Sequence, residues 1–329
     1  MGKIDDIQAY KEWTEYHRSL KRDKAADNLS PVERKKKLEK LEANVIEWIL
    51  FFFSEFAKYP FTKFHKKAIK RITTNMEWYE VLSWSRELAK STIVFMCMMY
   101  LVLTGKKRNV LLISNSHENA VRLLEPYKKA FESNSMLKAY YGDLREFGSW
   151  TADEFTLTTG ATFRAIGALE SPRGTRKDAV RPDTALVDDF DTDADCRNPD
   201  ILKKKWEWFE EALFPTRSIS EDLLVIFCGN LIALDCCVKR AGDKADHWDI
   251  VNIRDKDGKS SWPEKNTEER INRIQSKIST KAFQQEYMNN PLSKSMPVIT
   301  CSNKLRTYTS AKFYSEDEIV GIITGKETK

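Results

Sequence analysis

The stretch WSRELAKST at residues 84–92 decides how the rest of the chain is interpreted. Lys90 and Ser91 match the end of the phosphate-binding pattern G-x-x-x-x-G-K-[ST], in which the lysine reaches the β- and γ-phosphates and the hydroxyl ligates Mg²⁺. Both glycines of that pattern are missing, because Trp84 stands in the first position and Ala89 in the second. Ala89 is small enough to cost little there, but Trp84 is a real departure. The stretch is either a modified phosphate-binding loop or an ordinary first turn of a buried helix.

The segments around this stretch have the order that a phosphate-binding loop requires. WYEVLSW predicts a strand that leads into the loop, and the apolar residues at 91–104 predict a helix that follows it. NVLLISNS at 109–116 predicts a second strand, and HENAVRLLEPYKKAFES after it has the apolar spacing of a helix. A further helix is expected around 61–72.

Strand-like and helix-like segments keep alternating farther along the chain. FTLTTGATFRAIGA at 155–168 alternates around Gly160 and predicts a β-hairpin. TALVDDFD at 184–191 predicts a strand that ends in acidic residues, and DLLVIFCGN at 222–230 predicts one that ends in Gly-Asn. NPDILKKKWEWFEEALFP between them predicts a helix. This order predicts an α/β fold with a mostly parallel sheet flanked by helices.

The amino-terminal part of the chain is expected to be helical. Ser30 is a predicted N-cap, with Pro31 at the first helical position and Glu33 three residues after the cap. Apolar residues continue at helical spacing as far as Ile49, so one helix should lay a face on the protein and show the basic run at 34–37 to solvent or to DNA. The predicted division is a helical extension at 1–57, a domain at 58–300 that contains the phosphate-binding stretch, and a linker or tail at 301–329.

Composition indicates a soluble globular protein. The chain has 329 residues and 41% hydrophobic residues, enough for a sizeable core in one or two domains. Its longest apolar run is shorter than the ~18 residues that a membrane span needs, and we expect no membrane association. The formal charge of +5 permits a nucleic-acid partner without requiring one. Six cysteines without a C-x-x-C spacing predict reduced thiols in a cytoplasmic setting and no zinc site.

The acidic end of the strand at 184–191 supplies the second requirement of nucleotide hydrolysis. Asp188 is the candidate that holds Mg²⁺ together with Ser91, and Asp189 is the candidate that polarises the attacking water. An acidic cluster after a strand can also be a solvated turn. Its position after the loop, with a strand in between, favours the functional interpretation. The predicted fold is therefore a P-loop NTPase of the RecA/ASCE type that uses ATP and Mg²⁺.

Several segments together resemble the ATPase domain of a large terminase subunit, the DNA-packaging motor of tailed bacteriophages. They are WSRELAKST, LLISNSHENA, SPRGTRKDAVRPDTALVDDFD, VIFCGN and FQQEYMNNP, and the resemblance covers roughly residues 58–295. The specific features are an arginine in the loop, an Arg-Gly shortly before the RPD that leads into the acidic pair, and the late asparagine-rich segment. This family uses a modified loop of the same kind, so the opening stretch is interpreted as a nucleotide site.

The resemblance implies roles for individual residues. The whole loop would bind ATP, which assigns Trp84, Ser85, Arg86, Glu87, Leu88, Ala89, Lys90, Ser91 and Thr92. Arg86 would touch the γ-phosphate, where a guanidinium can stabilise the charge that develops on the transferred group. An ordinary exposed arginine is the alternative.

Three further assignments lie outside the loop. Arg173 and Arg176 are candidates for an arginine finger that acts on a neighbouring subunit, although a flexible basic loop could equally touch DNA or nothing. Asn230 would sense hydrolysis, or belong to an ordinary Gly-Asn turn. Phe64 and His65 would contact the adenine base, unless they are a helix-packing phenylalanine and a surface histidine.

The chain departs from the family in two respects. The acid that activates water is usually glutamate, so with Asp189 the water must lie closer, or Asp189 is not the base. A complete large terminase also carries a nuclease domain, and the residues after Pro291 are too few and too poor in acids to form one. We therefore expect no nuclease activity, and either an ATPase domain alone or a nuclease on a separate chain.

The leading hypothesis is an ATPase that translocates double-stranded DNA into a procapsid. The resemblance implies a homo-oligomeric ring, a pentamer, on the portal protein, with the small terminase subunit as a partner, in the host cytoplasm during virion assembly. The isolated chain could be a monomer. One alternative is a helicase or repair ATPase, for which a second RecA-like domain is missing. The other is a DNA-binding assembly subunit without catalysis, suggested by Trp84 and the absent glycines.

Overall fold

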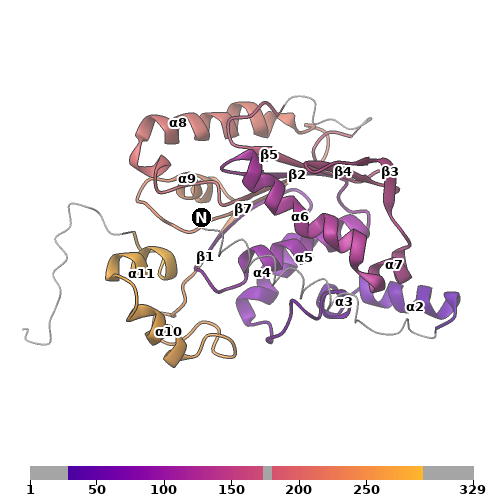
Figure 1. Ribbon diagram of the computed structural model, residues 1–329, viewed down its shortest axis with the longest axis horizontal. Coiled ribbons are helices and arrows are strands. Elements are labelled where there is room, and N and C mark those ends of the chain that lie inside the picture. Colours follow the sequence, from indigo (N-terminus) through magenta and orange to yellow (C-terminus); the bar gives the residue numbers. More distant parts are fainter. Residues whose placement is uncertain (1–28, 173–179, 292–329) are drawn as a thin grey trace, which may run out of the picture. The chain divides into compact units, whose positions relative to one another are not determined.

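The apolar segments of the sequence form one mixed sheet in this computed structural model, which describes residues 29–172 and 180–291. The sheet has eight strands in the order β3-β4-β5-β2-β6-β7-β1-β8 (Figure 1). The strands are β1 (Trp78–Trp84), β2 (Asn109–Ser114), β3 (Arg145–Trp150), β4 (Glu154–Leu157), β5 (Thr162–Gly167), β6 (Thr184–Asp188), β7 (Leu224–Cys228) and β8 (His247–Val251). β4 runs antiparallel to both of its neighbours and the other pairs are parallel, so the predicted α/β class and the hairpin at 155–168 are confirmed.

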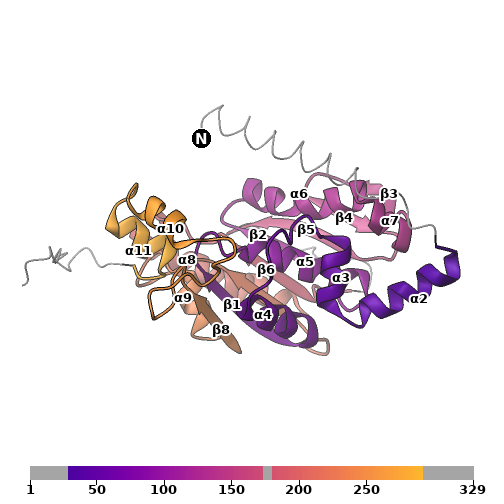
Figure 2. The same ribbon diagram turned by 90° about the horizontal axis from the view of Figure 1, so that it is seen from below.

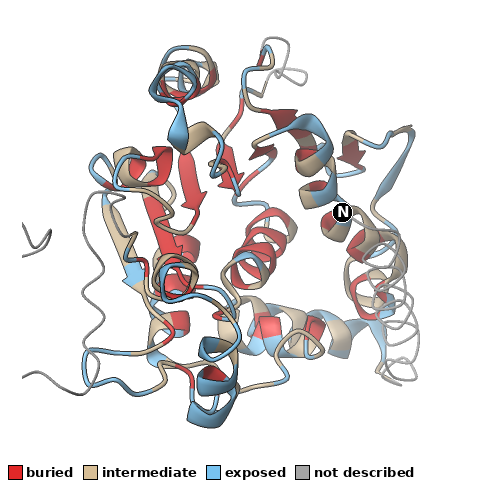
Figure 3. Cartoon of the chain, turned by 60° about the vertical axis from the view of Figure 1, so that its left-hand side comes forward, coloured by how far each residue is buried: buried red, intermediate tan, exposed pale blue. Residues whose placement is uncertain are grey.

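Helices cover both faces of the sheet. Packing on one face comes from α3 (Val45–Phe52), α4 (Lys63–Thr74), α5 (Lys90–Leu103), α6 (His117–Ser133) and α7 (Ser135–Tyr141), and α2 (Pro31–Glu42) lies at its margin. The other face carries α8 (Pro199–Glu207) and α9 (Cys237–Gly242), as Figure 1 shows, while α10 (Glu268–Gln275) and α11 (Thr280–Tyr287) follow β8. Alternate residues of one strand enter different cores: Leu112 belongs to the core that includes α5, whereas Ile113 belongs to the core that includes α8. Figure 3 shows the central strands as buried.

The register of the central strands brings the ends of β1, β6 and β7 to the same level. Asp188 at the end of β6 pairs with Cys228 at the end of β7, and Leu82 of β1 pairs with the same Cys228. Because parallel strands end at the same edge, the residues that follow β1, β6 and β7 gather there, at the carboxyl edge where α/β proteins bind ligands. Every residue of β2, β6 and β7 is buried, as expected for strands with both faces covered.

The amino-terminal region differs from the single helix that the periodicity predicts. The capping box of Ser30 and Glu33 is present, but the helix ends at Glu42. Asn44 then caps α3, and its Oδ1 accepts hydrogen bonds from the backbone N–H groups of Ile46 and Glu47. This local cap competes with a continuous helix and redirects the chain. Trp48 of α3 is completely buried and packs in the same core as α5. The predicted domain boundaries at residues 57 and 300 stay predictions.

The strands β3 and β8 and the helices α7, α9, α10 and α11 were not predicted, and one predicted helix is irregular. β3 and β8 lie at the sheet edges, where half-exposed residues give a weak pattern. The helix predicted before β7 leaves α-geometry at Glu207 and continues as a π-helix over Trp208–Leu213. Within the described ranges, the cysteines carry free thiols, and no helix combines the length and apolarity that a bilayer crossing requires.

A buried lysine bonds to the residues that precede three adjacent strands, at the sheet edge opposite the carboxyl edge. The Nζ of Lys107 donates hydrogen bonds to the backbone carbonyls of Met76 (2.9 Å), Asp183 (3.1 Å) and Asp222 (3.0 Å), just before β1, β6 and β7. Its side chain is almost fully buried, and burial lowers its pKa. All three ammonium protons have partners, which is the condition for burying such a charge.

We therefore expect Lys107→Met to lower the free energy of unfolding by about 2–4 kcal/mol, because three buried carbonyls lose their donor. Urea unfolding followed by circular dichroism measures the change. The control is Lys106→Met, since Lys106 is exposed and adjacent in sequence. Equal losses in the two variants would show that Lys107 has no special role.

Candidate nucleotide site

A cavity of about 620 Å³ opens at the carboxyl edge of β1, β6 and β7. Of the residues predicted to form the site, those that line the cavity are Trp84, Ser85, Arg86, Glu87, Ala89, Lys90, Ser91, Thr92, Asp189 and Asn230. Leu88 is buried beneath the loop, and Asp188 is buried against Ser91. Arg173 and Arg176 lie outside the described residues. The structure thus brings together segments that are far apart in the sequence.

The loop has the backbone conformation that glycines usually supply. Glu87 has φ of 69° and Ala89 has φ of 59°, both in the left-handed region. A side chain there costs about 1–3 kcal/mol and persists only where surrounding contacts hold it. The Nζ of Lys265 (2.8 Å) and the Nδ2 of Asn266 (3.1 Å) both donate to the carbonyl of Glu87. Contacts from the segment after β8 therefore hold the loop backbone at Glu87 in a conformation that a glycine would adopt more easily.

His65 supports the loop from below. Its Nε2 lies 3.0 Å from the carbonyl oxygen of Leu88, and its Nδ1 lies 3.2 Å from the backbone N–H of Thr62. The geometry assigns the proton to Nε2, and burial, with the nearby Lys265, lowers the pKa of His65 to about 4, so the ring is neutral. Both nitrogens are thereby satisfied inside the protein.

The adenine contact expected for Phe64 and His65 stays a prediction, and the structure gives both rings a packing role. The His65 side chain has no exposed surface, and neither residue lines the cavity. Both rings instead pack edge-on against Trp84, with centroid distances of 4.9 Å from Phe64 and 5.4 Å from His65. Trp84, the residue that departs most from the loop pattern, is thus held in an aromatic cluster with α4.

The first turn of α5 carries the groups expected for phosphate and metal. Lys90 Nζ donates to Asn230 Oδ1 at 3.1 Å, and Ser91 Oγ donates to Asp188 Oδ2 at 2.6 Å. Burial raises the pKa of Asp188, opposed by the positive charge of Lys90. A hydroxyl and a carboxylate are the hard oxygen donors that Mg²⁺ prefers, so these residues fit that ion.

Asp189 has an environment different from that of its neighbour. It is exposed to the cavity and has φ of 47°, so the chain turns sharply after β6. The buried Lys205 of α8 holds the next segment, because its Nζ bonds to the carbonyl of Phe190 and, at 2.8 Å, to Asp195 Oδ2. Sequence reasoning missed Lys205, since a lysine between Lys204 and Trp206 gives no sign of burial.

The segment around α11 borders the cavity on another side. Glu286 Oε2 accepts from Arg86 Nε at 2.5 Å, and its backbone carbonyl accepts from Asn230 Nδ2 at 3.0 Å. Asn289 Nδ2 donates to the carbonyl of Ser83 at 2.8 Å. Arg86 is therefore paired with an acid, with its side chain 66% exposed. Further residues that line the cavity and were not predicted include Asn115, Asn119, Asp193, Lys265 and Glu286.

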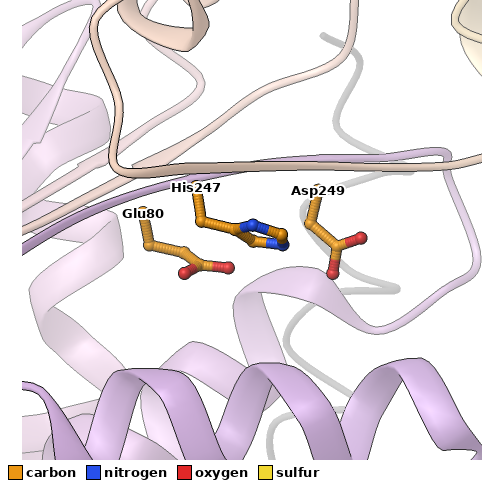
Figure 4. Close-up of side chains that lie close together, drawn as sticks. All are labelled: Glu80, His247 and Asp249. Carbon is orange, nitrogen blue, oxygen red and sulfur yellow. The ribbon is translucent and has the colours of Figure 1, made fainter.

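A second cluster of possible metal ligands lies on β1 and β8. Glu80, His247 and Asp249 bring ligand atoms within 4.8 Å of one another (Figure 4). Arg71 of α4, however, bonds to Glu80 at 2.6 Å and to Asp249 at 2.8 Å. Its guanidinium supplies the positive charge that the two carboxylates need. We interpret the cluster as an ion-pair network that fastens α4 to the sheet.

Comparison with known proteins gave structural matches only. No protein-family model matches the sequence, and no curated protein matches it. The HK97 bacteriophage large terminase shares 14% identity with a TM-score of 0.48, over 71% of this chain and 51% of that one, so this chain spans about half its length. The Thermus phage P74-26 large terminase ATPase domain shares 16% identity with a TM-score of 0.44, over 73% of this chain and 97% of that one. An arginine-to-alanine mutant of that domain gives 16% identity, a TM-score of 0.43, and coverage of 73% and 98%.

These three structures are of large terminases, the family that the sequence segments resemble. Identity and TM-score are both low.

Proposed function

We propose that this chain is a Mg²⁺-dependent ATPase. The observation that carries the proposal is the hydrogen bond of 2.6 Å between Ser91 Oγ and Asp188 Oδ2, with Lys90 at the adjacent position of the same helix turn. A hydroxyl at the start of a helix and a carboxylate at the end of a neighbouring strand are the pair that holds Mg²⁺ in P-loop NTPases. The cavity beside them is large enough for a nucleotide.

Each residue then has a defined task. Backbone N–H groups at the start of α5 bind phosphate oxygens, and Lys90 moves from Asn230 to the β- and γ-phosphates. Ser91 and Asp188 would hold Mg²⁺, which would supply positive charge beside the phosphates when bound. Asp189, exposed to the cavity, accepts the proton of the water that attacks the γ-phosphorus, and ADP leaves. Arg86 stabilises the transferred group after leaving Glu286.

The finer proposal is that hydrolysis drives translocation of double-stranded viral DNA into a procapsid. Its support is the set of terminase-like segments in the sequence together with the site that they form. In this proposal the chain works as a ring on a portal protein with a small terminase subunit, in the host cytoplasm. Arg173 or Arg176 would reach the site of a neighbouring subunit. Phosphate contacts would grip the DNA without sequence preference.

Steady-state ATP hydrolysis by the purified chain, with and without linear double-stranded DNA, tests this function. We expect Mg²⁺-dependent hydrolysis that rises with DNA and with protein concentration, because an arginine from a neighbour completes the site only in the assembled ring. A chain that neither hydrolyses nor binds ATP would contradict the ATPase proposal and favour an assembly subunit. Hydrolysis that never responds to DNA would contradict the motor.

A further inference from the structure

α4 presents a row of lysines on its outer surface. Lys63, Lys66, Lys67 and Lys70 are all exposed, and their spacing places them within roughly a third of the helix circumference. The opposite face is apolar, with Ala68, Ile69 and Ile72 buried completely. We call these four residues the α4 lysine row. α4 lies on the side of the molecule turned towards the viewer in Figure 2.

Among the residues that the structure describes, no acidic side chain pairs with the α4 lysine row. α4 contains no acidic residue, and none of the four lysines forms an ion pair or a hydrogen bond through its side chain with the residues that the structure describes. By contrast, Arg71 on the same helix is paired with two carboxylates. The lysines stand three or four positions apart, so each repels its neighbours, and like charges at these spacings destabilise a helix.

The position of Lys63 adds to this unfavourable arrangement. It lies in the first turn of α4, where the helix dipole favours negative charge, and no acidic residue occurs in that turn. In a helix with this pattern, no acidic residue of the helix offsets the repulsion among the lysines or between Lys63 and the helix dipole. A polyanion along the row would relieve every one of these repulsions.

We propose that the α4 lysine row binds the phosphate backbone of double-stranded DNA. Seven residue steps of helix cover about 10 Å, which matches about three successive phosphates along one strand. Lysine ammonium groups on flexible stems contact phosphates without reading bases, as a motor that moves along any sequence requires. This inference rests on the proposed motor function and specifies where the DNA lies.

The same helix also touches the phosphate-binding loop. His65, between the lysines in sequence, bonds to the carbonyl of Leu88 from the buried face of α4. DNA held on the outer face would thus be one helix diameter, about 10 Å, from the loop. Binding of DNA could therefore influence the rate of hydrolysis through α4 as a rigid element.

The test compares two variants of the full chain with equal net charge. In the first, the four lysines of the α4 row are changed together to glutamine, which has a similar helix propensity. In the control, the exposed lysines Lys256, Lys259, Lys277 and Lys281 are changed to glutamine. Fluorescence anisotropy with a labelled double-stranded DNA of arbitrary sequence gives the Kd over a series of salt concentrations.

We expect the α4 variant to bind DNA about 10- to 100-fold more weakly near 0.1 M salt, with the slope of log Kd against log salt reduced by about 2 to 3. The control variant should stay within about 3-fold of wild type. DNA should no longer stimulate ATP hydrolysis by the α4 variant, while its basal rate is unchanged. Its Tm should stay the same or rise, because repulsion within α4 is removed.

Equal weakening in both variants would overturn the proposal, since general charge would then explain the loss. Unchanged DNA binding by the α4 variant would overturn it as well, and would turn attention to an acidic protein surface as the partner of the row. If the α4 variant binds DNA as tightly as the wild type does, the proposed motor function itself is not contradicted. A wild-type chain that binds no DNA contradicts the motor function and this inference together.

Discussion

Replacing Asp189 with asparagine should lower kcat for ATP hydrolysis by about 10²- to 10⁴-fold, the range for loss of a general base. Affinity for ATP should stay within about 3-fold, because Asp189 faces the cavity without contacting Lys90 or Ser91 through any hydrogen bond described in the structure. Single-turnover hydrolysis and equilibrium binding of a fluorescent ATP analogue separate the two quantities. The result decides whether an aspartate can replace the usual glutamate.

A matched control exists in the same cavity. Asp193 also lines it, but its carboxylate accepts a hydrogen bond from Gln285 at 2.9 Å. Asp193→Asn should lower kcat by less than about 5-fold, because this acid has a structural partner. If Asp189→Asn hydrolyses ATP nearly as fast as wild type, the base is elsewhere. Asp189→Glu keeps the carboxylate and adds one methylene group. This variant should preserve activity if the only consequence of the longer side chain is a shift of the attacking water.

Sequence reasoning found the parts of the fold that depend on strong local patterns. The continuous apolar sequences of β2 and β7 indicate strands that are buried on both faces. Helix α6 has the predicted bounds. The association of Lys90, Ser91 and Asp188 was also predicted, because the topology of parallel strands brings these ends together. Their roles in binding and catalysis stay predictions until activity is measured.

What sequence reasoning missed depends on tertiary contacts. Nothing in the helical periodicity reveals that Asn44 caps a second helix. His65 was assigned to the base by analogy, yet its burial beneath Leu88 follows from the packing of α4 against Trp84. Lys107 and Lys205 look like surface lysines in the sequence, and only the fold provides their buried partners, three carbonyls for Lys107 and a carbonyl and a carboxylate for Lys205. Sequence reasoning therefore failed mainly for charged residues that the fold buries.

Replacing Lys90 with alanine should weaken ATP binding by about 10- to 100-fold, because a charged hydrogen bond to phosphate is worth about 1.5–3 kcal/mol and each 1.4 kcal/mol is tenfold. Hydrolysis should fall at least as much, since the same ammonium stabilises charge on the transferred group. Isothermal titration with Mg²⁺-ATP measures the affinity.

The comparison that makes the Lys90 result specific is Lys265→Ala. Lys265 also lines the cavity, but its Nζ is bound to the carbonyl of Glu87 at 2.8 Å, so it supports the loop rather than the phosphates. Its loss should weaken ATP binding by less than about 10-fold. If both variants lose affinity equally, the cavity attracts ATP by overall positive charge, and the loop has no phosphate-binding lysine. If only Lys90→Ala loses it, a loop without glycines binds phosphate through the same lysine as the glycine-rich form, and the contacts of His65, Lys265 and Asn266 explain how its backbone is held.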